Sequence, residues 1–166
     1  MAKEFTYKQS FGSDPVAVFT MLRDPEYVQA KCAATGSLKT TIDVTESADG
    51  SVTITSTRVL PAEVPAAAKK FVGETISATE TQEWSPAAVD GSRTATVTVD
   101  FSGPLAFSGR LALRPFGDGS EVVTEGSFKA SVPFVGGTIE SVAAEQTARY
   151  LGAEERVAAE WMRDSD

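Results

Sequence analysis

The chain of 166 residues contains no histidine and only one cysteine, Cys32. The absence of histidine removes the base of Ser–His and Cys–His nucleophile pairs, and it also removes the commonest metal ligand. A lone cysteine cannot form a disulfide within the chain, which fits a reducing compartment, and without histidine it makes a zinc site very unfavourable. We therefore assign no metal site, no cofactor and no catalytic residue.

Basic residues and long apolar runs are also scarce. The 15 Lys and Arg residues are outnumbered by 23 Asp and Glu residues, which gives a formal net charge of -8. Nucleic acids and anionic membranes both attract basic surfaces, so this acidity disfavours both as partners. No apolar run approaches the length of a membrane span, and the N-terminal sequence MAKEFTYKQSF lacks the apolar core of a signal peptide. We expect a cytoplasmic protein that does not insert into membranes.

The remaining pattern predicts one domain over residues 1–166, built from strands and helices in a simple order. A strand is expected over residues 3–11, and two short helices follow it, each opened by an Asp-Pro pair. From residue 37 onward, apolar residues alternate with polar ones, which predicts about six consecutive strands joined by short turns. Such a succession is typical of an antiparallel meander. One long amphipathic helix is predicted from residue 138 to about residue 163.

The sequence SVPFVGGT joins the last predicted strand to the long helix. Pro133 cannot donate a hydrogen bond within a sheet, so it is expected to end the strand. Phe134 and Val135 are expected to anchor the corner, while Gly136 and Gly137 supply unusual dihedral angles and a close approach of backbones. A bent antiparallel sheet has to bury one face, and the long helix is the only element large enough to cover it.

The long helix is expected to turn one face toward the sheet and the other toward solvent. The inward face is predicted to carry Ile139, Ala143, Gln146, Tyr150, Ala153, Val157 and Trp161. The solvated face is predicted to carry Glu140, Glu145, Arg149, Glu154, Glu155, Arg156 and Glu160.

The chain resembles the START-like, or Bet v 1-like, helix-grip (SRPBCC) superfamily in this order of elements and in the stretches FTYKQSFGSDPVAVFTMLRDPEYV, ETQEWSP and VPFVGGTIES. More narrowly, it resembles a branch known as DUF2505, a domain of unknown function. The resemblance implies an α+β fold in which a curved seven-stranded antiparallel sheet wraps around a long C-terminal helix, with two short helices after the first strand. It also implies a cavity between sheet and helix. Members of the superfamily bind lipids, sterols, polyketides or plant hormones there, and some relatives are aromatase/cyclases or hydrolases.

Strand parity predicts which side chains face this cavity. Two of them are charged, namely Arg58 and Glu80, which fall on adjacent strands within diagonal reach of each other. A buried charge is costly without a partner, so these residues either orient a ligand's carboxylate or hydroxyl, or reach water, or pair only for stability. The candidate ligand-binding residues are Arg58, Glu80, Gln82, Phe107, Phe128, Gln146 and Tyr150.

The segment PAEVPAAAKKFVG interrupts the meander and is longer than a turn between strands requires. Within it, Val64, Ala68 and Phe71 are spaced as on one face of a short helix. Two interpretations remain open: a lid that covers the mouth of the cavity, or a surface helix that caps the core.

These observations predict a domain that binds a small hydrophobic molecule, such as a lipid, a polyketide or an aromatic carboxylate, as a monomer or weak homodimer. The alternative is a cyclase, dehydratase or hydrolase of the same fold that uses Glu80 and Arg58. The chain offers no histidine, metal cluster or nucleophile–base pair to support such chemistry, so binding is favoured. A third alternative is a core filled by aromatic side chains, used only for contacts with other proteins.

Overall fold

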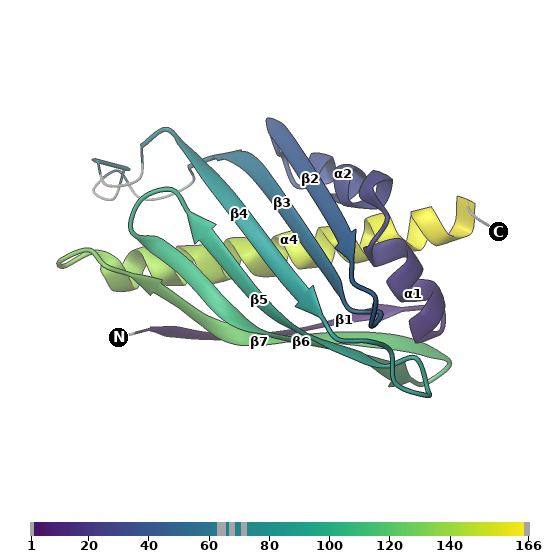
Figure 1. Cartoon of the computed structure of the whole chain (residues 1–166). Coiled ribbons are helices and arrows are strands. Elements are labelled where there is room, and N and C mark those ends of the chain that lie inside the picture. The colour runs from purple at the N-terminus through teal and green to yellow at the C-terminus, as the bar shows by residue number, and fades with distance from the viewer. Residues whose placement is uncertain (1, 63–65, 67–68, 71–72, 165–166) are drawn as a thin grey trace.

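The structure is a computed structural model that describes residues 2–62, 66, 69–70 and 73–164 (Figure 1). In this part of the chain, seven strands form one antiparallel sheet in the order β1-β7-β6-β5-β4-β3-β2, and a long helix runs along one face of it. The elements are β1 (Lys3–Phe11), α1 (Pro15–Leu22), α2 (Pro25–Ala34), β2 (Lys39–Glu46), β3 (Val52–Pro61), β4 (Thr75–Trp84), β5 (Arg93–Phe101), β6 (Leu105–Phe116), β7 (Gly119–Ala130) and α4 (Gly136–Asp164). The predicted helix-grip architecture is confirmed.

The two short helices begin as their Asp-Pro pairs predict. The Asp14 side chain accepts a hydrogen bond from the backbone nitrogen of Ala17 at 2.9 Å, and Asp24 accepts one from Glu26 at 2.9 Å. A proline follows each capping residue, where its missing N–H costs nothing. Figure 1 shows both helices beside one end of the sheet, next to the C-terminal half of α4.

Alternation along the strands places the predicted residues on the inner face. In β3, the even-numbered residues from Val52 to Leu60 are buried and the odd-numbered ones from Thr53 to Val59 are only half-buried. Ser56 pairs with Glu80 across to β4, and Arg58 pairs with Ala78. Arg58 and Glu80 therefore occupy diagonal positions on neighbouring strands, as predicted.

Two glycines on the inner face allow close approach between β6 and β7. Gly109 and Gly126 lie directly opposite each other. A Cβ atom at Gly109 would overlap the backbone oxygen of Glu125, and one at Gly126 would lie 2.6 Å from Cζ of Phe107. The space over Gly126 is thus occupied by the Phe107 ring, which packs at 4.6 Å from the Phe128 ring. The lack of a side chain at Gly109 and Gly126 therefore lets β6 and β7 approach each other and does not create room for a ligand.

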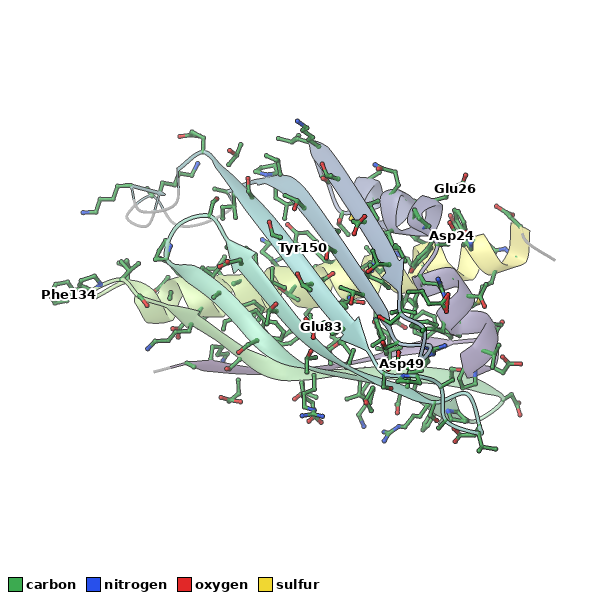
Figure 2. The ribbon with its side chains drawn as sticks, viewed as in Figure 1. Asp24, Glu26, Asp49, Glu83, Phe134 and Tyr150 are labelled. Atoms are coloured by element: carbon green, nitrogen blue, oxygen red, sulfur yellow. The ribbon has the colours of Figure 1, made fainter. Side chains whose placement is uncertain are left out.

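The corner between β7 and α4 differs from the prediction. Gly136 and Gly137 do not adopt left-handed dihedral angles, because α4 already begins at Gly136. Phe134 takes that conformation instead, with φ of 68°, and its side chain is fully exposed at the tip of the corner (Figure 2). The prediction that Phe134 anchors the corner is therefore wrong. The close approach is confirmed at Gly136, where a Cβ atom would lie 2.9 Å from the backbone oxygen of Ala130.

The inward face of α4 also differs from the prediction, because Glu140 and Glu154 are buried rather than solvated. Their exposed fractions are 3% and 6%. Glu140 is compensated by a hydrogen bond of 2.8 Å from the backbone nitrogen of Ala130. The buried positions of the helix are Gly136, Ile139, Glu140, Ala144, Glu154 and Ala158. From Glu140 onward, each of them lies one residue after a position that was predicted to face inward.

Two sequence expectations concern membranes and the lid. No helix among the described residues is both long and apolar enough to cross a membrane. The proposed lid residues Val64, Ala68 and Phe71 lie outside the described residues.

Candidate functional site

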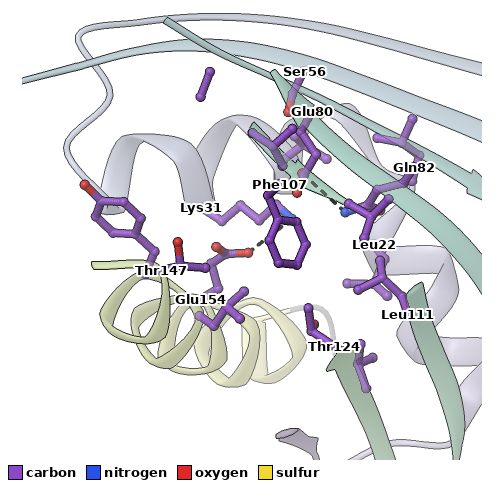
Figure 3. Close-up of a pocket in the computed structure, with 18 of the residues that line it drawn as sticks. Leu22, Lys31, Ser56, Glu80, Gln82, Phe107, Leu111, Thr124, Thr147 and Glu154 are labelled. Atoms are coloured by element: carbon purple, nitrogen blue, oxygen red, sulfur yellow. Dashed lines mark hydrogen bonds and ion pairs between the residues drawn. The ribbon is translucent and has the colours of Figure 1, made fainter. Parts of the chain in front are cut away.

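A cavity of about 120 Å³ lies between the sheet, α2 and α4 (Figure 3). Inward side chains of the sheet make most of its wall. The helices contribute Leu22 from α1, Tyr27, Val28 and Lys31 from α2, and Thr147, Tyr150, Leu151 and Glu154 from α4. The wall is largely apolar, but it contains charged groups from four elements of the fold, α2, β3, β4 and α4. The cavity is therefore an apolar space with a polar region in its wall.

The structure brings six of the seven predicted site residues to this cavity. Those that line it are Arg58, Glu80, Gln82, Phe107, Phe128 and Tyr150. Gln146 lines a smaller neighbouring pocket of about 60 Å³ instead. Gln146 is displaced from the cavity because the inward line of α4 runs through Thr147, one residue later.

Four charged side chains line the cavity and form what we call the charge cluster: Lys31, Arg58 and Glu154, which are buried, and Glu80, which is half-buried. Lys31 Nζ lies 3.2 Å from Glu154 Oε1, and this ion pair connects α2 to α4 (Figure 3). Burial acts to lower the pKa of Lys31, but the carboxylates of Glu154 and Glu80 outweigh it and raise that pKa above its ordinary value. Two cations and two carboxylates balance each other, which is why charges are tolerated here.

Sequence reasoning missed Lys31 and Glu154. Glu154 follows Tyr150 by four residues and therefore shares its face of the helix, and this spacing was the available signal. Lys31 likewise follows the fully buried Tyr27 by four residues. The ion pair itself joins helices that lie far apart in the chain, so no local pattern predicts it.

Arg58 is a member of the cluster with unused hydrogen-bonding capacity. Its side chain is 8% exposed, and its Nη1 donates to Thr35 Oγ1 at 3.2 Å. Among the described residues, its Nε and Nη2 have no hydrogen-bond partner. In that part of the chain, every fully buried side-chain nitrogen or oxygen has a hydrogen-bond partner. The two nitrogens of Arg58 that have no partner are therefore not fully buried, and they border accessible space. The space that Arg58 lines is the cavity.

Arg58 does not form an ion pair with Glu80 within the described part of the chain, although the two lie on neighbouring strands. Burial by itself lowers the pKa of the Arg58 guanidinium, but the nearby carboxylates of Glu154 and Glu80 hold that pKa above its usual value. Arg58 therefore stays charged while it lines the cavity.

Glu80 belongs to a chain of hydrogen bonds along the inner face of β4. Trp84 Nε1 donates to Gln82 Oε1 at 2.9 Å, and Gln82 Nε2 donates to Glu80 Oε1 at 3.3 Å. An indole N–H can only donate, so it fixes which end of the Gln82 amide faces Glu80. The arrangement presents Glu80 to the cavity as a hydrogen-bond acceptor.

Cys32 follows Lys31 in the chain and is fully buried. Burial raises the pKa of the Cys32 thiol, which keeps it in its unreactive protonated form. In the part of the chain that the structure describes, no group of three or more carboxylate, cysteine or histidine side chains is arranged to hold a metal ion. The arrangement is suited to holding a small molecule through the Arg58 donors, the Glu80 acceptor and apolar walls.

Comparison with known proteins supports the fold. The sequence model of a family described as "Protein of unknown function (DUF2505)" matches residues 6–162 of the chain. No curated protein sequence matches it.

Several solved structures are similar over nearly their whole length. A START superfamily protein from Mycobacterium smegmatis is 12% identical, with 96% of this chain and 98% of that chain covered and a TM-score of 0.60. The Zhui aromatase/cyclase from Streptomyces sp. R1128 is 12% identical, with 95% and 94% covered and a TM-score of 0.62. A protein from Thermus thermophilus, TTHA0849, is 17% identical, with 93% and 96% covered and a TM-score of 0.63. At these identities the similarity establishes the helix-grip fold alone.

Proposed function

This chain belongs to the DUF2505 family, and we propose that it binds a small, mostly apolar molecule with an acidic head group in the cavity between the sheet and α4. The observation that carries the proposal is Arg58, a buried guanidinium whose unpaired N–H donors border an otherwise largely apolar cavity. A guanidinium presents its donors as a planar fork that matches the two oxygens of a carboxylate.

The size of the cavity narrows the class of ligand. Its volume is about 120 Å³. A cavity of about 150 Å³ lined by apolar side chains accommodates benzene in another protein. The cavity in its present shape therefore suits an aromatic or short-chain carboxylate better than a whole lipid or polyketide.

The proposal is tested by calorimetric titration with benzoate, benzamide and benzyl alcohol, which share one ring and differ in the head group. We expect benzoate to bind most tightly. Truncating one partner of a buried, hydrogen-bonded charge contact costs about 2–5 kcal/mol, so the preference for the acid is within the range of calorimetry.

Two variants make the test specific to Arg58. Arg58→Met removes the fork and the charge while keeping apolar bulk, and should abolish the preference for benzoate. Arg58→Lys keeps the charge without the fork, and should retain part of the preference. Equal affinity of the parent protein for benzoate and benzamide would show that the proposal is wrong.

A second candidate function is an enzyme of the cyclase, dehydratase or hydrolase type with Glu80 as its base. It is favoured by one observation: the Glu80 carboxylate lines the cavity and is held there by a hydrogen bond from Gln82 Nε2. The two functions differ in the fate of the ligand, because a binding protein releases it unchanged. Mass spectrometry of a bound acid after prolonged incubation distinguishes them: conversion by the parent and not by Glu80→Gln would favour the enzyme.

The oligomeric state and the compartment stay predictions: a monomer or weak homodimer in the cytoplasm.

A further inference from the structure

A second pocket of about 60 Å³ lies between the same sheet and the same helix as the cavity. Strands β3 to β6 supply one wall and the first four turns of α4 supply the other. The described residues that line it are apolar except for Gln146, Thr147 and Tyr150, and none of them is charged. The pocket therefore suits a hydrocarbon group and offers an acid no charged partner among the described residues.

The two spaces share part of their lining. Leu60, Phe101, Thr147 and Tyr150 border both of them, so the cavity and the second pocket adjoin at these residues. Leu60 lies on β3 and Phe101 on β5, and both strands pair with β4 in the sheet. Thr147 lies on α4 and has a short side chain. Tyr150, by contrast, is a long side chain that comes from α4, and it is half-buried.

We propose that Tyr150 is a partition that sets the size of ligand this protein accepts. While the tyrosine ring stands between the two spaces, the cavity accepts a ligand of about one ring. Removing the ring joins them into one apolar channel between the sheet and α4, which accepts an acid with a longer apolar tail.

This inference rests on the proposed function, because Arg58 would bind the acidic head group of the ligand and so determine where its apolar tail begins. Arg58 and Leu60 are two residues apart on the same inner face of β3, so the head group would lie beside the partition. Electrostatic interaction between Arg58 and Tyr150 is consistent with this proximity. A tail that begins there reaches the second pocket only past Tyr150.

The test measures how affinity depends on tail length, using benzoate, 4-propylbenzoate and 4-hexylbenzoate. Moving one methylene from water to an apolar site improves affinity about fourfold. In the parent protein, we expect affinity to stop rising, or to fall, once the tail reaches the partition. In Tyr150→Ala, we expect 4-hexylbenzoate to bind at least about tenfold more tightly than it binds the parent.

Two control variants isolate the partition. Tyr150→Phe keeps the ring and should behave as the parent does. Ala143→Leu, added to Tyr150→Ala, partly fills the second pocket and should remove the gain for the longest acid. Thermal unfolding of each variant confirms that it is folded before titration.

A parallel series of benzyl alcohol, 4-propylbenzyl alcohol and 4-hexylbenzyl alcohol separates this inference from the proposed function. A length limit that Tyr150→Ala removes in both series supports the partition, even if acids and alcohols bind equally and the role of Arg58 is wrong. The same length dependence in the parent and in Tyr150→Ala overturns the partition, whatever the head-group preference. If no compound binds any variant, both proposals are wrong.

Discussion

Replacing Lys31 with methionine tests the ion pair that connects α2 to α4 at the cavity. Lys31 Nζ lies 3.2 Å from Glu154 Oε1, and the two side chains are only 10% and 7% exposed. Methionine keeps much of the apolar stem, but it leaves the Glu154 carboxylate buried without its ion-pair partner. Removing one member of a buried ion pair typically costs about 3–5 kcal/mol of unfolding free energy. Arg58 still interacts with Glu154, so we expect the lower end of that range, about 3 kcal/mol.

Urea denaturation at neutral pH, followed by circular dichroism, measures this change. The double variant Lys31→Met with Glu154→Leu removes both charges, and should recover most of the lost stability, because apolar pairs often replace buried ion pairs without loss. The exposed pair of Arg23 and Glu46 supplies a matched control, since their atoms lie 3.3 Å apart but the side chains are 31% and 49% exposed. Arg23→Met should cost less than about 1 kcal/mol.

Two outcomes would refute this reasoning. If Lys31→Met costs no more than Arg23→Met, then Glu154 does not depend on its partner. If the double variant is less stable than Lys31→Met alone, then the loss comes from packing rather than from an unpaired charge.

Two further predictions concern stability. Burial raises the pKa of Tyr27 to about 12 from an ordinary value of 10.0, so its contribution to stability is complete below pH 10 and is lost as the pH rises toward 12. Between pH 10 and pH 12, the free energy of unfolding measured by urea denaturation should fall by up to about 3 kcal/mol more in the parent than in Tyr27→Phe. An equal fall in the two proteins would contradict this prediction. At the corner, Gly136→Ala should destabilise by about 1–3 kcal/mol through contact with the Ala130 oxygen. Gly137→Ala meets nothing within 4 Å and should be neutral or stabilising; thermal unfolding in the reverse order would contradict the corner geometry.

The sheet could be predicted well because its pattern is local. A period of two has only two phases, so assigning Val52 and Ile54 to the interior also placed Arg58 there. The same argument placed Glu80, Gln82 and Trp84 on one face of β4, where hydrogen bonds now connect them. The first residues of α1 and α2 could also be predicted from their Asp-Pro pairs, because a capping side chain binds a backbone N–H no more than three residues away.

The helix and the corner were predicted less well because their details depend on distant residues. On a helix, an error of one residue in the predicted inward face rotates that face by about 100° about the helix axis. For this reason Gln146 was wrongly assigned to the cavity and Glu154 was wrongly assigned to solvent. Glutamates on an amphipathic helix normally face solvent, and only Lys31 and the Ala130 backbone explain why Glu154 and Glu140 do not. Phe134 was misassigned because glycine is the usual residue at positive φ, and the sequence offered two glycines nearby.

The most direct test of the central claim is a nuclear magnetic resonance titration that follows the side-chain Nε–H signal of Arg58 in 15N-labelled protein. Assignment comes from the disappearance of that signal in Arg58→Met. Addition of benzoate should shift the signal strongly and saturably, because the carboxylate accepts hydrogen bonds from the guanidinium, while benzamide at the same concentration should shift it far less. A saturable response to benzoate in which the Arg58 Nε–H signal does not move, or equal shifts with benzoate and benzamide, would contradict the claim that Arg58 binds an acidic head group.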